Sequence, residues 1–182
     1  MKLPSLFRSL FFLYTILSVN ALSVVDKRAI ITTSPQLCAG DLDSVGIQLG
    51  QLQAAVITGG VLNIKHDYNT VSSQLDAAQD SCCALNQQMV ASTTDANMLL
   101  QSLAAVTPKA QNALTEIKNR ETNYNFLTRL FVKSYLKNLD RKTAALQTCF
   151  QQFMPAANAT TVQAYFNDID AAFNATKSAY GI

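Results

Sequence analysis

The stretch IKHDYNTVSSQLDAAQDSCCALNQQM, residues 64–89, decides the class of fold. Its apolar side chains recur in alternating steps of four and three, at Ile64, Tyr68, Val71, Leu75, Ala78, Cys82, Leu85 and Met89. Such steps bring side chains to one face of an α-helix, so the stretch predicts a long amphipathic helix. Cys82 lies on the apolar stripe, and Cys83 lies about 100° around the helix. The two thiols should therefore point at different neighbours.

The segments on either side repeat the same spacing. It predicts helices over residues 42–56, over 93–103, over 107–117, over 132–153 and over 162–180. We expect the first of these helices to end at Gly59-Gly60 and the fourth to end at Pro155. The helix over 107–117 should begin at Thr107-Pro108, with Thr107 as N-cap and Pro108 as first helical residue. Residues 29–40 read as irregular, and a bend is expected at residues 121–125. Since period-two alternation is absent, the sequence predicts an all-α antiparallel bundle of five or six helices.

The first 28 residues have the layout of an export sequence. Lys2 and Arg8 precede a short apolar run at residues 10–17, and small residues near Ala21 suit signal peptidase. Lys27-Arg28 then offers a dibasic cleavage site, although both could be ordinary surface charges. We therefore expect a signal peptide at 1–21, a propeptide at 22–28 and one helical domain at 29–182. The apolar run is shorter than the roughly 20 residues that span a bilayer, so no transmembrane segment is expected in the mature chain.

Charge and composition narrow the function. The chain has 14 basic and 12 acidic residues, and removing residues 1–28 leaves 10 basic and 11 acidic ones. A nearly neutral protein of this kind gives no reason to expect nucleic acid as a partner. The expected location is outside the cell, either free or in a cell wall.

The four cysteines, Cys38, Cys82, Cys83 and Cys149, suit disulfides in an exported chain. A bond between Cys82 and Cys83 is disfavoured because adjacent Cα atoms lie only about 3.8 Å apart. Two pairings remain open, and in both of them Cys38 and Cys149 each take one of the adjacent pair. A metal site is the weaker alternative, because His66 is the single histidine and no Cys-x-x-Cys motif occurs.

Motifs for chemistry are sparse. His66-Asp67 is more typical of a surface than of a catalyst, and no glycine-rich phosphate loop occurs, so we expect no enzyme activity and no cofactor. Asn158-Ala159-Thr160 and Asn174-Ala175-Thr176 are N-glycosylation acceptors.

Basic residues concentrate in one region of the chain. Four of them, Arg129, Lys133, Lys137 and Arg141, step by four and form one stripe. The simplest interpretation is a solvated helix face. The functional interpretation is a contact for acidic glycans such as those of a cell wall, for lipid headgroups or for a protein.

The apolar seams suggest a binding site as well as a core. A closed core is the simpler reading, but uneven packing of many alanines against crowded phenylalanines could leave a slot. Thr143 and Thr176 interrupt apolar stripes and could hold a ligand's polar end. The candidate lining residues are Leu49, Leu52, Val56, Tyr68, Val71, Leu75, Leu103, Leu114, Ile117, Leu139, Thr143, Leu146, Phe150, Ile169, Phe173 and Thr176.

Two stretches resemble a known family. FNDIDAAFNATKSAYGI, residues 166–182, and LAAVTPKAQNALTEIKNRETNYNFL, residues 103–127, are similar to segments of the fungal hydrophobic surface-binding protein A and cell-wall galactomannoprotein family. The resemblance implies a secreted helical bundle without enzymatic activity. It further implies binding of fatty acids in an apolar interior or adsorption to hydrophobic surfaces, where a secreted hydrolase can be recruited. The four cysteines depart from the family pattern and suggest a stiffer bundle.

Two functions follow from these observations. The first is binding of a fatty acid, another apolar ligand or a hydrophobic surface. The second is a secreted effector or cell-wall interaction protein that has a closed core and binds a protein partner.

Overall fold

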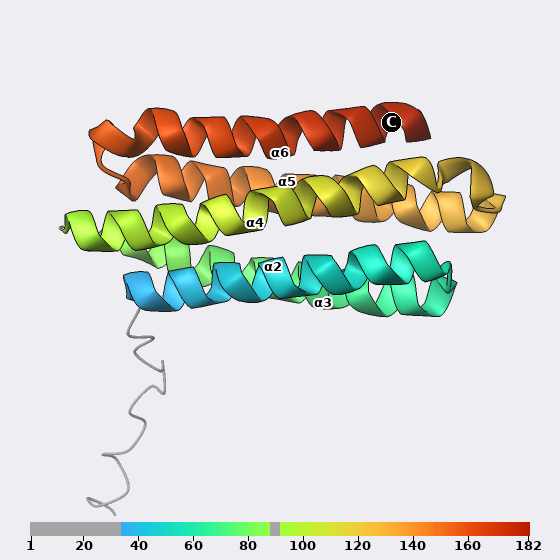
Figure 1. Ribbon diagram of the computed structural model, residues 1–182, viewed down its shortest axis with the longest axis horizontal. Coiled ribbons are helices and arrows are strands. Elements are labelled where there is room, and N and C mark those ends of the chain that lie inside the picture. Colours follow the sequence, from blue (N-terminus) through green and yellow to red (C-terminus); the bar gives the residue numbers. More distant parts are fainter. Residues whose placement is uncertain (1–33, 88–91) are drawn as a thin grey trace, which may run out of the picture. The chain divides into compact units, whose positions relative to one another are not determined.

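Five long α-helices make up most of the computed structural model, which describes residues 34–87 and 92–182 (Figure 1). They are α2 (Pro35–Thr58), α3 (Val61–Cys83), α4 (Thr93–Asn119), α5 (Phe126–Phe153) and α6 (Ala159–Tyr180). Short 3-10 turns, Ala84–Gln87, Glu121–Asn123 and Ala156–Asn158, join or extend them, and the described residues contain no strand. The predicted all-α bundle is confirmed. The expected signal peptide and propeptide, and Met89, lie outside the described residues.

Successive helices run antiparallel, and each helix packs mainly against two others. Helix α2 contacts α3 and α4, α6 contacts α4 and α5, and α3 contacts α5. The five helices therefore form a ring around a shared interior, with α4 between α2 and α6 in Figure 1. Gly46 allows α2 and α4 to approach closely, since an added Cβ would lie 3.1 Å from a methyl carbon of Val106.

The ring has two ends that differ in composition. The tyrosine end consists of the last turns of α2, α4 and α6 and the first turns of α3 and α5, and it holds Tyr68, Tyr124, Tyr135 and Tyr180. The disulfide end consists of the opposite turns of the same helices.

Local signals explain where the helices begin and end. The Ser34 hydroxyl accepts a hydrogen bond from the Leu37 backbone N–H (3.1 Å), and Asn125 Oδ1 accepts one from the Thr128 N–H (2.9 Å). Gly59 ends α2 with φ at 81°, a left-handed conformation that favours glycine.

Two boundaries differ from the sequence prediction. Helix α2 begins at Pro35, although residues 29–40 were expected to be irregular, because Ser34 is an N-cap and Pro35 fits the first helical position. Helix α4 continues through Pro108, where a new helix was expected to start. Thr107 is not an N-cap, because its hydroxyl donates to the Leu103 carbonyl (2.8 Å) inside the helix. The apolar face of α4 is buried on both sides of the proline, and that packing offsets the lost backbone hydrogen bond.

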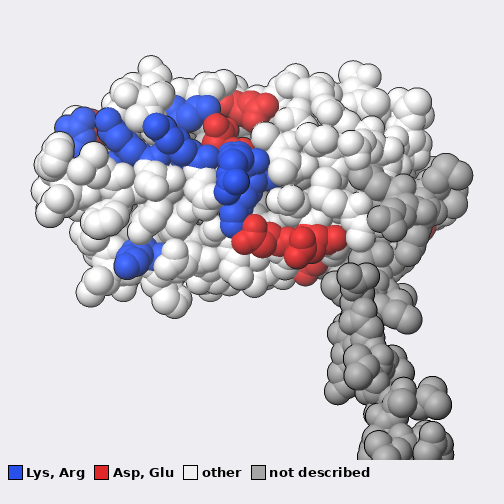
Figure 2. Space-filling model, turned by 180° about the vertical axis from the view of Figure 1, so that it is seen from behind, with Lys and Arg blue, Asp and Glu red and all other residues white. Residues whose placement is uncertain are grey.

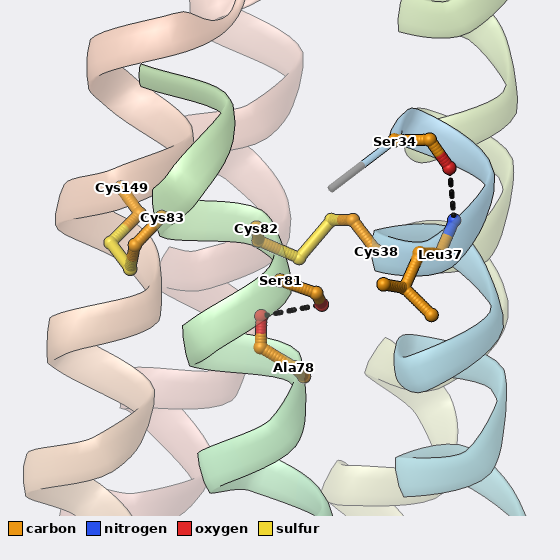
Figure 3. The surroundings of a disulfide bond; sticks show 8 residues. All are labelled: Ser34, Leu37, Cys38, Ala78, Ser81, Cys82, Cys83 and Cys149. Atoms are coloured by element: carbon orange, nitrogen blue, oxygen red, sulfur yellow. Dashed lines mark hydrogen bonds between the residues drawn. A yellow bond between two sulfur atoms is a disulfide. The ribbon is translucent and has the colours of Figure 1, made fainter. Parts of the chain in front are cut away.

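Two disulfides join three helices at the disulfide end (Figure 3). Cys38 of α2 is bonded to Cys82 of α3, and Cys83 of α3 is bonded to Cys149 of α5, with Cα atoms 4.8 and 4.9 Å apart. The adjacent cysteines point toward different neighbouring helices, as positions about 100° apart on α3 require. Neither bond reaches α4 or α6.

Candidate functional site

An apolar cavity lies inside the ring. Its volume is about 40 Å³, and all five helices contribute to its lining. The lining consists of apolar side chains together with Thr143, as follows: Leu42, Val45, Leu49, Leu52, Val71, Leu75, Leu103, Val106, Ala110, Ala113, Leu114, Ile117, Leu139, Thr143, Leu146, Phe166, Ile169 and Phe173. A site without charged groups suits the hydrocarbon part of a ligand.

A second apolar cavity of about 20 Å³ continues the first toward the tyrosine end. The two share Leu52, Ile117 and Leu139 as lining residues. The second cavity is otherwise lined by Val56, Ile64, Tyr68, Tyr124, Val132, Tyr135 and Leu136. Along α5 the combined lining runs from Val132 to Leu146, which is roughly 21 Å at about 1.5 Å per residue.

Aromatic rings close the interior at the disulfide end. The Phe150 ring lies 5.0 Å from the Phe153 ring and 5.8 Å from the Phe166 ring, measured between centroids. Phe150 is fully buried, and Phe166 lines the larger cavity. The two adjoining cavities, called the apolar channel below, extend from these rings toward the tyrosine end.

Most of the lining candidates named from the sequence lie at these cavities. Twelve of them line the larger cavity, and Val56 and Tyr68 line the smaller one. Phe150 and Thr176 line neither. Lining residues outside the candidate set include Leu42, Val45, Ala110, Ala113 and Phe166, which lie on predicted helices. They also include Val106, which lies between two predicted helices that the structure joins as α4.

The two threonines do not offer free donors. The Thr143 hydroxyl donates to the Leu139 carbonyl (2.9 Å), although its side chain lines the larger cavity. The Thr176 hydroxyl lies between the carbonyls of Ala172 (2.8 Å) and Leu114 (3.1 Å). Neither is therefore arranged to hold a carboxylate.

Tyr124 is the unusual polar group of the interior. Its side chain lines the second cavity, and its hydroxyl is buried with no hydrogen-bond partner among the described residues. Burial raises the pKa of Tyr124, and the nearby Arg120 charge lowers it in part. The phenol is thus a neutral donor beside a cation, at the end of an apolar channel. Buried polar groups nearly always have partners, so this hydroxyl suggests that a partner binds there.

Other groups at the tyrosine end are already paired. Tyr68 and Tyr135 stack with ring centroids 3.7 Å apart, and the Tyr68 oxygen accepts a hydrogen bond from Asn138 Nδ2 (2.6 Å). One turn further along α5, toward the disulfide end, Lys142 donates to Ser72 Oγ (2.7 Å) and pairs with Asp76 (2.6 Å). These bonds join α3 to α5.

The remaining sequence motifs lie on the surface. The His66 side chain is 78% exposed, and its Nδ1 lies 2.9 Å from Asp67 Oδ1. In the basic stripe, Arg129 pairs with Glu121, Arg141 donates to Asn138 (3.0 Å), and Lys137 is exposed. Asn174 is exposed on α6, and Asn158 is half-buried in the turn before it.

Metal binding and membrane spanning find no support in the described residues. No group of three or more His, Cys, Asp and Glu side chains is placed to hold a metal ion. Within the same residues, none of the helices combines the length and hydropathy needed to span a membrane.

The fold and its interior define a disulfide-linked helical bundle with an apolar channel. AfMp4p, solved in complex with palmitic acid, has a similar fold, with a TM-score of 0.73 and 21% identity over 81% of this chain and 99% of that one. A similar fold is also found in ligand-binding domain 1 of the Penicillium marneffei MP1 protein, complexed with arachidonic acids. That comparison gives a TM-score of 0.68 and 15% identity, and it covers 79% of this chain and 95% of that one. No protein-family model and no curated protein matches the sequence.

Proposed function

We propose that this protein is a secreted, non-enzymatic carrier that binds one fatty acid in the interior of its helical ring. The observation that carries the proposal is the channel itself, which has apolar lining from all five helices. It ends at a buried tyrosine hydroxyl for which residues 34–87 and 92–182 provide no hydrogen-bond partner. The fatty acids bound by the two proteins of similar fold support the same ligand class. The disulfides favour a location outside the cell, where such bonds persist.

The length of the channel fits a long acyl chain. Zigzag C–C bonds of about 1.5 Å advance roughly 1.25 Å per carbon, so sixteen carbons need roughly 19 Å. The combined lining spans roughly 21 Å along α5. In this orientation the carboxylate lies at the tyrosine end, where it accepts a hydrogen bond from Tyr124 and faces the Arg120 charge.

The volume of the channel requires the helices to move. The two cavities hold about 40 and 20 Å³, well below the roughly 300 Å³ of a small ligand pocket. Burying the fourteen methylenes and the methyl group of palmitic acid contributes about 12 kcal/mol, at about 0.8 kcal/mol each. A micromolar Kd corresponds to about 8 kcal/mol, so opening the ring and ordering the ligand must cost no more than about 4 kcal/mol.

The small cavity is also the observation that favours the second candidate. If the ring does not open, the interior is a closed core, and the protein acts through its surface as a secreted effector or cell-wall interaction protein. The exposed basic side chains of α5 would then contact a protein or an acidic cell-wall glycan.

Native mass spectrometry separates the two candidates. Delipidated protein mixed with palmitic acid should gain the mass of one fatty acid, and a shorter chain such as hexanoic acid should bind far more weakly. Protein that gains no mass at saturating palmitic acid, but captures a protein partner saturably, would exclude the carrier function.

A further inference from the structure

Several large apolar side chains are exposed at the tyrosine end. On the first two turns of α5, Phe126 is 75% exposed, and Leu127, Leu130 and Phe131 are also exposed. These four recur at spacings of one and four, so they share one face of the helix, away from its buried stripe. At the α2–α3 turn, Leu62 is 81% exposed.

Large apolar side chains are rarely exposed elsewhere in the described residues. Ile57 and Val61 also lie at the α2–α3 turn, whereas Leu37 and Ile47 lie singly on other parts of α2. Scattered exposed residues are ordinary, but a group gathered at one end of a protein marks an interaction site.

Charge is distributed unequally between the two ends. In the ten residues of each helix nearest the tyrosine end, and the α4–α5 connection, six side chains are basic and three are acidic. The basic ones are Lys65, Lys118, Arg120, Arg129, Lys133 and Lys177, and the acidic ones are Asp67, Glu116 and Glu121.

The disulfide end has the opposite charge. The ten residues of each helix nearest that end carry no basic side chain and six aspartates, which are Asp41, Asp43, Asp76, Asp80, Asp95 and Asp168. Figure 2 shows one face of the molecule, on which Lys and Arg form a band from one end to the middle. The described residues therefore have a positive end that is also apolar, and a negative end.

We propose that the tyrosine end docks on an anionic lipid bilayer. Phe126, Phe131 and Leu62 insert among the headgroups, while the surrounding cations contact phosphates. Each Lys or Arg near an anionic membrane surface contributes about 1 kcal/mol, which raises the membrane partition coefficient roughly fivefold. Asp76 is paired with Lys142, and the other five aspartates orient the protein, because contact through the disulfide end would be repelled.

This docking would place the second cavity over the bilayer, since Tyr124 and Tyr135 line that cavity at the same end. A fatty acid could then pass between bilayer and channel without crossing water. That consequence rests on the proposed carrier function, whereas the docking does not.

Vesicle co-sedimentation tests the docking. The purified protein is mixed with vesicles of phosphatidylcholine, or of equal parts phosphatidylcholine and phosphatidylglycerol. We expect binding to the anionic vesicles, weak binding to the neutral ones, and loss of binding at about 1 M salt, where charges are screened within roughly 3 Å. Replacing Phe126→Ser together with Phe131→Ser should weaken the binding roughly tenfold or more, because two apolar side chains no longer leave water.

Matched variants make the result specific. Ile47→Ser with Leu37→Ser removes two exposed apolar residues outside the tyrosine end and should leave vesicle binding unchanged. Lys118→Gln with Lys133→Gln should weaken binding to anionic vesicles by roughly 25-fold, with no effect on neutral ones.

Three outcomes would overturn the docking. The first is equal binding to both vesicle types. The second is an equal loss of vesicle binding in the phenylalanine variant and in the Ile47 and Leu37 control. The third is binding to a protein or to a solid hydrophobic film without any binding to vesicles. Palmitic acid binding is measured in solution on the same variants. If the phenylalanine variant still binds palmitic acid but no longer binds vesicles, docking is separate from the carrier function. If the unmodified protein binds vesicles but no palmitic acid, the carrier function alone is rejected.

Discussion

Filling the interior should weaken ligand binding and stabilise the empty protein. Ala113 lies two turns before the end of α4, is 1% exposed and lines the larger cavity. Ala113→Leu adds three carbons at a position where the structure has unfilled space. Leucine is nearly as favourable as alanine in a helix, so helix propensity changes little.

The two expected magnitudes have opposite signs. The added side chain takes the place of about three ligand methylenes, at about 0.8 kcal/mol each, so affinity for palmitic acid should fall by about 2.4 kcal/mol, or roughly 50-fold. A cavity of about 40 Å³ costs the empty protein about 1 kcal/mol at roughly 24 cal/mol per Å³. Filling it should therefore raise the free energy of unfolding by up to about 1 kcal/mol.

Calorimetric titration with palmitic acid measures the affinity, and urea unfolding without ligand measures the stability. Ala105→Leu is the matched control, because Ala105 lies on the same helix and is exposed. It should change neither quantity by a measurable amount. Unchanged affinity in Ala113→Leu would refute an interior binding site. A loss of stability of about 1–3 kcal/mol would show instead that the interior is already fully packed.

Four further changes test separate parts of the structure. Cys83→Ser with Cys149→Ser opens a loop of 66 residues and should lower the free energy of unfolding by about 4 kcal/mol, measured in urea. Tyr124→Phe should weaken palmitic acid binding roughly tenfold but leave binding of its methyl ester unchanged by calorimetry, and equal losses for both ligands would reject a role for the hydroxyl. Lys177→Gln breaks an ion pair between α6 and α5 and should speed palmitic acid uptake in stopped-flow fluorescence, and an unchanged rate would place the opening elsewhere. Burial raises the pKa of Tyr180 above its ordinary value, so the unfolded chain loses this proton at a lower pH than the folded protein does. The free energy of unfolding should therefore fall as the pH rises above about 10. Tyr180→Phe should flatten that fall in urea unfolding, and an unchanged slope would mean that other groups cause it.

The sequence was sufficient to predict the helices because burial in this fold follows helical periodicity. The stripe from Ile64 to Leu85 and the seams of the other helices reappear as the buried residues of the ring. The prediction failed at Ser34-Pro35 and Thr107-Pro108 for one shared reason. A serine or threonine before proline is compatible with the start of a helix, with a loop or with a helix interior, and tertiary packing decides among them.

The candidate site was only partly predictable. Periodicity identifies the inward face of each helix, and twelve of the sixteen candidates line the larger cavity. It cannot tell which inward residues border empty space, because that depends on how five helices pack together. Tyr124 was missed because it follows a 3-10 turn between helices and belongs to no stripe. Of the two disulfide pairings left open by the sequence, the structure has Cys38–Cys82 and Cys83–Cys149.

The contacts between helices indicate where the ring could widen. Helices α2, α3 and α5 are joined by both disulfides and by the bonds of Asn138 and Lys142 across α3 and α5. Helices α4 and α6 form a second group, because Thr176 and Tyr180 of α6 donate to the Leu114 and Ile117 carbonyls of α4.

Two seams separate these groups. The α2–α4 seam is extensive and includes the close approach at Gly46, whereas the α5–α6 seam has the smallest contact between major helix pairs. Side chains that join α5 to α6, such as the Lys177–Asp140 pair (2.7 Å), are partly exposed and contribute little to stability. A ligand larger than the empty channel would therefore separate α6 from α5, with α2–α4 as the hinge. The disulfides lie wholly within one group, so they stiffen it without preventing this movement.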